Sequence, residues 1–150
     1  MAIVRSAGTE IIRSAWFEDI DGSVDTVLIF GEQHHIYTVL NITVYTVSLQ
    51  AVTNEFSVKL LGYDAKGGDT NQQIQIFSQL VPASETFVFS DKFSFNGHEP
   101  TDFTGPMDDA AKQNAIADQG SSVAQKLRCH GHHADDNFEV TVTYIDQNNA

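Results

Sequence analysis

SETFVFSDKFSF, residues 84–95, is the stretch that decides the predicted fold. Mostly small and polar residues occupy one parity of this stretch, and four phenylalanines occupy the other: Phe87, Phe89, Phe93 and Phe95. A period of two is typical of a strand with one buried face. Each buried phenylalanine contributes roughly 2–3 kcal/mol of transfer free energy. We therefore predict an all-β core with this stretch as its central strand.

Asp91 interrupts the apolar face of this stretch. An unpaired carboxylate would be costly in a protein core. We therefore expect a β-bulge at Asp91, or a bend at which the strand passes from one sheet to the other.

The run from Ile36 to Val52 is β-branched and aromatic almost throughout, but its apolar parity changes twice. One straight strand cannot change parity. The run therefore contains bulges, or it consists of two strands joined by a tight turn near residues 40–43. Farther along the chain, alternating apolar residues from Phe138 to Tyr144 predict a closing strand.

The whole chain, residues 1–150, is predicted to form a single antiparallel β-sandwich of the jelly-roll type. About eight to ten short strands, separated by turn signals roughly every 8–12 residues, support this fold class. Residues 1–9 are expected to form an N-terminal arm or a first edge strand. One short surface helix is predicted over residues 107–119, with aspartates near its start and Gly120 just past its end.

The composition of the chain limits its partners. Its 20 Asp and Glu outnumber its 8 Lys and Arg and give a net charge of -12, which would repel nucleic acid. No apolar run is long enough for a membrane helix or a leader peptide, so we expect a soluble protein made in a cytoplasm, with no membrane partner. A single cysteine, Cys129, excludes an internal disulfide framework.

The most metal-like group in the sequence is RCHGHH, which contains Cys129, His130, His132 and His133. Cysteine and histidine at short spacing suit zinc or nickel. In an extended strand, however, Cys129 and His133 share one parity while the other two histidines share the opposite one. The alternative, which we favour, is a hairpin turn between the last two strands, with no bound metal and no cofactor.

His130 and His132 also invite comparison with the cupins, which are jelly-roll metal enzymes. In the cupin motif a glutamate follows the HxH pair after about three or four residues and a glycine comes later. Here six residues separate His132 from Glu139, and no glycine follows. The cupin-like reading therefore fails on spacing.

A second candidate site alternates oxygen-bearing side chains: Asp19, Asp21, Ser23 and Asp25. A helix-flanked calcium loop would place a glutamate at position 30, where this chain has Phe30. We favour a solvated turn and keep weak calcium binding as the alternative.

The remaining histidines and aromatic residues offer two further readings. His34, His35 and His98 could supply acid–base groups, but no serine elbow, paired-carboxylate motif or phosphate loop accompanies them, so we expect surface histidines and no enzyme. Four aromatic residues could line a sugar-binding groove, a second face of the sandwich or a subunit interface: Trp16, Tyr37, Tyr45 and Tyr63.

The segments RSAGTEII, VPASETFVFSDKF and FEVTVTYIDQNN, near the start, middle and end of the chain, carry a resemblance to a known class. The chain resembles the small β-sandwich structural proteins of tailed bacteriophage virions. In such proteins a strand of the VTVTY type closes the sandwich, and the chain ends a few polar residues later.

This resemblance implies a mechanical function in the virion. The expected protein is a capsid decoration protein that binds the major capsid protein, stabilises the shell and assembles as a homotrimer. The alternatives are a tail or fibre adaptor of the virion and, in another class, a carbohydrate-binding module.

Overall fold

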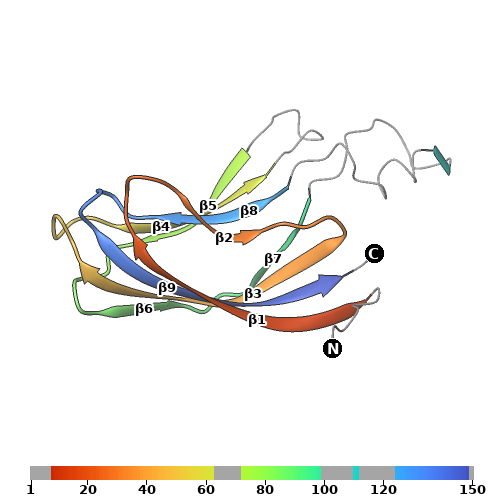
Figure 1. Cartoon of the computed structure of the whole chain (residues 1–150), viewed down its shortest axis with the longest axis horizontal. Coiled ribbons are helices and arrows are strands. Elements are labelled where there is room, and N and C mark those ends of the chain that lie inside the picture. Colours follow the sequence, from red (N-terminus) through yellow and green to blue (C-terminus); the bar gives the residue numbers. More distant parts are fainter. Residues whose placement is uncertain (1–7, 63–71, 99–109, 112–123, 149–150) are drawn as a thin grey trace.

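The computed structural model describes residues 8–62, 72–98, 110–111 and 124–148 (Figure 1). Its strands form two antiparallel sheets that pack face to face, which confirms the predicted β-sandwich. The strands are β1 (Thr9–Ile20), β2 (Thr26–Phe30), β3 (His35–Ser48), β4 (Phe56–Gly62), β5 (Gln72–Gln79), β6 (Thr86–Phe89), β7 (Phe93–Asn96), β8 (Lys126–His130) and β9 (Asn137–Asn148).

The strand order is that of a jelly roll. Sheet A has the order β1-β9-β3-β6, with β7 also paired to β3, and sheet B has the order β2-β8-β4-β5. Because β6 and β7 pair with successive segments of β3, they act as one interrupted strand. Each sheet then holds four strands, and the chain crosses repeatedly from one sheet to the other.

The phenylalanine-rich stretch lies at the edge of sheet A, so the prediction of a central strand is wrong. In β6, Phe89 pairs with Ile42, and in β7, Phe93 pairs with Val39, so both strands border β3. Asp91 lies in the break between β6 and β7, and the chain stays in the same sheet there. A one-sided apolar face is common to edge and central strands, and periodicity does not distinguish them.

The four phenylalanines do face the interior, as predicted. Phe77 of β5 in the opposite sheet stacks 4.7 Å from Phe89 and lies 5.6 Å from Phe87, measured between ring centroids. Phe95 is buried and lies 5.4 Å from the ring of Tyr37. An aromatic row therefore closes this side of the sandwich.

β3 is one strand with bulges, which confirms that reading of residues 36–52. Its register against β9 shifts between Val39 and Asn41, and again between Thr46 and Ser48. The first shift moves the buried parity from Val39 to Ile42. An inserted residue therefore accounts for the change of parity in the sequence.

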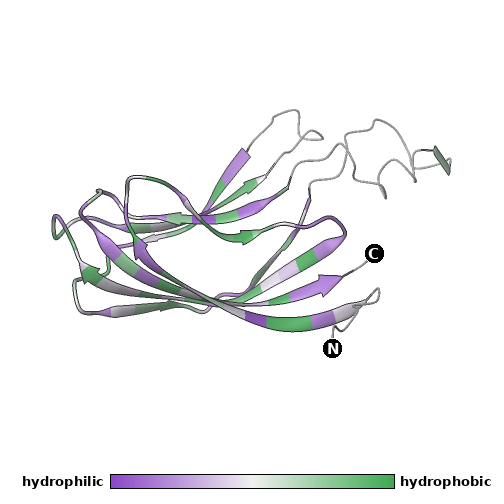
Figure 2. Cartoon of the chain, in the orientation of Figure 1, coloured by the Kyte–Doolittle hydropathy of each residue, from purple (hydrophilic) through white to green (hydrophobic). Residues whose placement is uncertain are grey.

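The core lies between the sheets and is built mainly from β3, β4, β8 and β9. Phe138 of β9 and Phe56 of β4 are fully buried, and their ring centroids lie 5.1 Å apart across the sandwich. Figure 2 shows hydrophobic and hydrophilic segments alternating along the strands, and a hydrophobic segment in the N-terminal half of the edge strand β1. The helix predicted over residues 107–119 and the arm predicted over residues 1–9 lie almost entirely outside the described residues.

Candidate functional site

The outer face of sheet A belongs to the lower layer in Figure 1. The residues at the centre of this face carry no charge. Strand pairing aligns Ile12 with Ile145 and Thr38 in one row, and Trp16 with Thr141, Thr43 and Val88 in another. Ser14, Thr143 and Asn41 lie between these rows. Acidic residues lie beyond these rows along the strands, Glu10 toward one end of the sheet and Glu18 with Glu139 toward the other. We call the surface between them the uncharged face.

Large apolar side chains are exposed on the uncharged face. Ile12 is 72% exposed, Trp16 59% and Val88 54%. Leaving such side chains in water forgoes the transfer free energy that their burial would supply. Grouped on one face, they are typical of an interaction site rather than of scattered surface residues.

Two pairs of hydroxyl groups on the uncharged face are hydrogen-bonded. Ser14 Oγ lies 3.1 Å from Thr143 Oγ1, and Thr38 Oγ1 lies 2.9 Å from Ser94 Oγ. A polar group that already has a partner costs less to remove from water. The face can therefore be covered by a partner at a low desolvation penalty.

The size of the uncharged face suits a small protein interface. Four strand widths and the seven residues between Glu10 and Glu18 span roughly 20 Å by 23 Å. That footprint is roughly 460 Å², somewhat more than half of the roughly 800 Å² that each partner contributes to a standard interface.

The RCHGHH segment does not gather its side chains around one point. Cys129 points into the core, and burial raises the pKa of its thiol to about 12, so it stays protonated at neutral pH. His130 faces the opposite side of sheet B, with its Nδ1 2.7 Å from Gly131 O. His132 and His133 lie exposed in the loop that follows. This loop joins β8 in sheet B to β9 in sheet A, so the predicted hairpin is wrong.

Asp136 explains the local structure of that loop. Its Oδ2 accepts hydrogen bonds from the backbone N–H groups of His132 (2.9 Å) and His133 (2.8 Å). Its Oδ1 accepts from the Gln50 N–H (2.9 Å) and from Asn54 Nδ2 (3.0 Å). Burial by itself would raise the pKa of Asp136. Together, the four hydrogen bonds lower the pKa by more than burial raises it, so the net shift is downward. Asp136 thus ties the β8–β9 loop to the β3–β4 loop.

The carboxylates of the calcium-like segment turn to separate partners. Asp21 Oδ1 accepts hydrogen bonds from the N–H and Oγ of Ser23, and the Ser23 bonds lower its pKa. Asp25 Oδ2 lies 3.4 Å from a guanidinium nitrogen of Arg128, and Asp19 Oδ1 accepts from the Asn137 amide (3.2 Å). Within the described part of the chain, no three His, Cys, Asp or Glu residues group as metal ligands.

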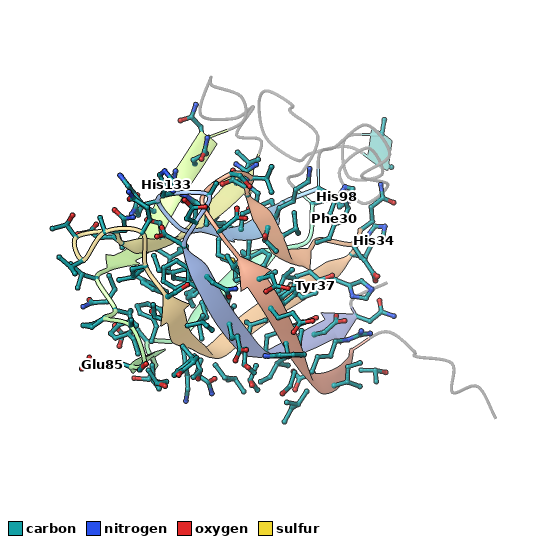
Figure 3. The ribbon with its side chains drawn as sticks, turned by 60° about the vertical axis from the view of Figure 1, so that its left-hand side comes forward. Phe30, His34, Tyr37, Glu85, His98 and His133 are labelled. Carbon is teal, nitrogen blue, oxygen red and sulfur yellow. The ribbon has the colours of Figure 1, made fainter. Side chains whose placement is uncertain are left out.

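The histidines and aromatic residues are likewise divided. Figure 3 shows His34 and His98 near Phe30, with His133 at the opposite end of the molecule. Burial, with a smaller effect of His34, lowers the pKa of His98.

Tyr37 is buried, and burial raises its pKa to about 12. Two other aromatic residues, Trp16 and Tyr45, lie on the outer face of sheet A, and Tyr63 lies outside the described residues. The prediction of one groove lined by Trp16, Tyr37 and Tyr45 together is therefore wrong.

The sequence analysis missed a cluster of acidic and basic side chains on the inner side of β1, β3 and β9. Asp146 is buried; its Oδ1 lies 2.6 Å from His35 Nδ1, and its Oδ2 lies 3.2 Å from Arg13 Nε. His35 Nε2 lies 3.3 Å from Glu32 Oε2. Each imidazole nitrogen already faces a carboxylate, so the ring has a structural rather than a catalytic geometry. The available signal was Asp146 itself, which shares the inward parity of Val140 and Val142.

No family model matches the chain, and no curated protein matches it. Among solved structures, the chain is similar to one described as "Bacillus endospore appendages form a novel family of disulfide-linked pili". The TM-score is 0.44 and the sequence identity 7%, over 100% of this chain and 97% of that chain. Among the described residues, no helix is long and apolar enough to cross a membrane.

Proposed function

We propose that this protein is a non-catalytic structural protein that binds another protein through the uncharged face of sheet A. In its specific form, the proposal is the one that the sequence resemblance implies: a decoration protein of a bacteriophage shell. The observation that supports the docking role is the group of exposed apolar side chains, Ile12, Trp16 and Val88, on a surface whose centre carries no charge. Burial of this face would supply the binding free energy by the hydrophobic effect.

The chemistry of the face favours a protein partner over a glycan. A glycan site combines aromatic platforms with polar groups that are free to bind sugar hydroxyls. On the uncharged face, Ser14 and Thr143 pair with each other, as do Thr38 and Ser94. The exposed aliphatic side chains suit the apolar centre of a protein interface.

The charge of the chain favours a different protein over a second copy at this face. Two copies placed face to face would bring the acidic residues that border the face close together, in chains that each carry a net charge of -12. Like charges across an interface oppose association. A partner with neutral or basic groups around its docking surface fits better, and a shell offers such a surface in many copies.

A variant of one exposed residue tests the docking role. Ile12→Glu places a charge among the exposed apolar residues of the face and should reduce binding to purified shells at least about tenfold, because the carboxylate would be desolvated. Val52→Glu is the matched control, since Val52 is 83% exposed in the β3–β4 loop, and it should bind normally. The assay is co-sedimentation with shells, with copies per particle counted by quantitative mass spectrometry.

The outcomes separate the alternatives. Equal shell binding by Ile12→Glu and the unsubstituted chain would remove the docking role of this face. Binding in small multiples at one vertex would replace decoration by the tail or fibre adaptor. A chain that binds no particle but retains a polysaccharide would favour the carbohydrate-binding alternative.

A further inference from the structure

The outer face of sheet B, the upper layer in Figure 1, has a different chemistry. The four strands of this sheet contain no Asp or Glu, although the chain has 20 such residues. Strand pairing places Lys59 beside Arg128, and both Lys126 and His130 share the outward parity of Arg128. We call these four residues the basic face.

The basic face concentrates the positive charge of the described residues. Five Lys and Arg are described, and three of them belong to it; the five are Arg13, Lys59, Lys92, Lys126 and Arg128. In a chain with a net charge of -12, such a local excess attracts an acidic partner.

Arg128 is a charged donor on this face and is only partly engaged by its own chain. One of its guanidinium nitrogens makes a long contact, 3.4 Å, to Asp25 Oδ2, and its Nε has no hydrogen-bond partner. A carboxylate is the acceptor that matches a guanidinium best.

A matching acidic surface lies at the loop end of the same molecule, at the left in Figure 1. The β1–β2 and β8–β9 loops meet there, since the Gly131 N–H donates to Asp21 O (2.9 Å) and the Gly22 N–H donates to His133 O (3.0 Å). Glu18, Asp19 and Asp135 are exposed in this region.

We infer that the basic face of one copy binds the acidic loop end of a second copy. Both surfaces occur on one chain, and their charges are complementary. Nucleic acid fits less well, because it carries a negative charge at every phosphate along its length, whereas a second copy presents its acidic loop end locally. This contact leaves the uncharged face free, so it does not depend on the function proposed above.

The two surfaces differ and point in different directions, so the contact is heterologous. Repeated heterologous contacts form a ring when the rotation closes and a filament when it does not. The trimer expected from the sequence would be one such ring, and the contact proposed here provides its physical basis.

Charge reversal tests the inference on the full chain by sedimentation velocity at low and high salt. The unsubstituted chain should self-associate at about 20 mM NaCl and dissociate at about 500 mM, because salt screens exposed charges. Lys59→Glu with Lys126→Glu should weaken the association about tenfold, and so should Glu18→Lys with Asp135→Lys. Lys59→Glu alone should also weaken the association, and Lys92→Glu is its control of equal charge change outside the basic face and should associate normally.

The combined variant carrying all four reversals decides the matter. Its charges are exchanged rather than lost, so association should return to within about threefold of the unsubstituted chain. The inference is overturned if the combined variant stays monomeric while its circular dichroism matches that of the parent. A monomeric parent at about 100 µM and low salt would also overturn it. So would binding of a single-stranded DNA 20-mer that requires Lys59 and Lys126 in a chain that does not self-associate.

Discussion

The two outer faces of this sandwich cover the same core but present opposite chemistry. Sheet A shows exposed apolar side chains among paired hydroxyls, whereas sheet B shows lysine and arginine without any acidic residue in its strands. The inward side chains of each strand form the core, and the outward side chains are available for binding. The difference suggests two partners, one held by apolar burial and one held by charge.

The comparison requires that neither outer face is needed for folding, and β9 provides the largest test. Phe138→Ala removes a fully buried ring at the contact between the sheets and should lower the free energy of unfolding by about 3–5 kcal/mol. Thr141→Val changes the outward side of the same strand and should alter stability by no more than about 0.5 kcal/mol. Urea denaturation measures both.

A large effect of Thr141→Val would break the comparison at sheet A. The hydroxyl of the uncharged face would then stabilise the fold, and its presence would no longer argue for a partner. A small effect of Phe138→Ala would instead mean that the core tolerates the cavity by collapse.

A second prediction divides the acidic residues of the loop end into buried structural groups and exposed groups. Asp136→Asn replaces one carboxylate oxygen by an NH₂ group that cannot accept hydrogen bonds from backbone N–H groups. Stability should fall by about 2 kcal/mol. Asp135→Asn is the matched control, since the Asp135 side chain is 78% exposed, and it should leave stability unchanged. Thermal or urea unfolding at neutral pH measures the difference.

The pH dependence of Asp136 has a definite sign. Its pKa in the folded protein lies below the ordinary value of 3.8, so the folded state favours the ionised form. The contribution of Asp136 is therefore complete above about pH 4–5 and is lost as the pH falls through the folded pKa. Asp136→Asn should show a shallower loss of stability on acidification than the parent. An equally steep loss in both proteins would assign the acid sensitivity to other carboxylates.

Local features of the fold were predictable from the sequence. Alternation identified the interior side of the phenylalanine-rich stretch, and the parity change of residues 36–52 indicated either a bulged strand or two strands joined by a turn, of which the structure has the first. Both signals depend on neighbouring residues and therefore survive without knowledge of pairing. The closing strand from Phe138 onward was predictable for the same reason.

Features that depend on long-range pairing were not predictable. Only the pairing with β3 places β6 and β7 at an edge, and only the crossover at residues 131–136 shows that β8 and β9 belong to different sheets. His35 and Asp146 meet although 111 positions separate them. The two outer faces have the same origin, because residues from distant strands become neighbours only when the register is known.

The smallest predicted effect is a change in tryptophan fluorescence, which reports which face a partner covers. Trp16 is the single tryptophan of the chain and lies 59% exposed on the uncharged face. Acrylamide should therefore quench its fluorescence readily in the free protein. Docking on a shell should reduce quenching and shift the emission to shorter wavelengths, because the indole leaves water. Self-association at low salt should leave both unchanged, since that contact is assigned to the basic face of one copy and the loop end of the other, and the indole of Trp16 belongs to neither. Reduced quenching on self-association alone would show that a second copy covers the uncharged face, and the roles assigned to the two faces would be reversed.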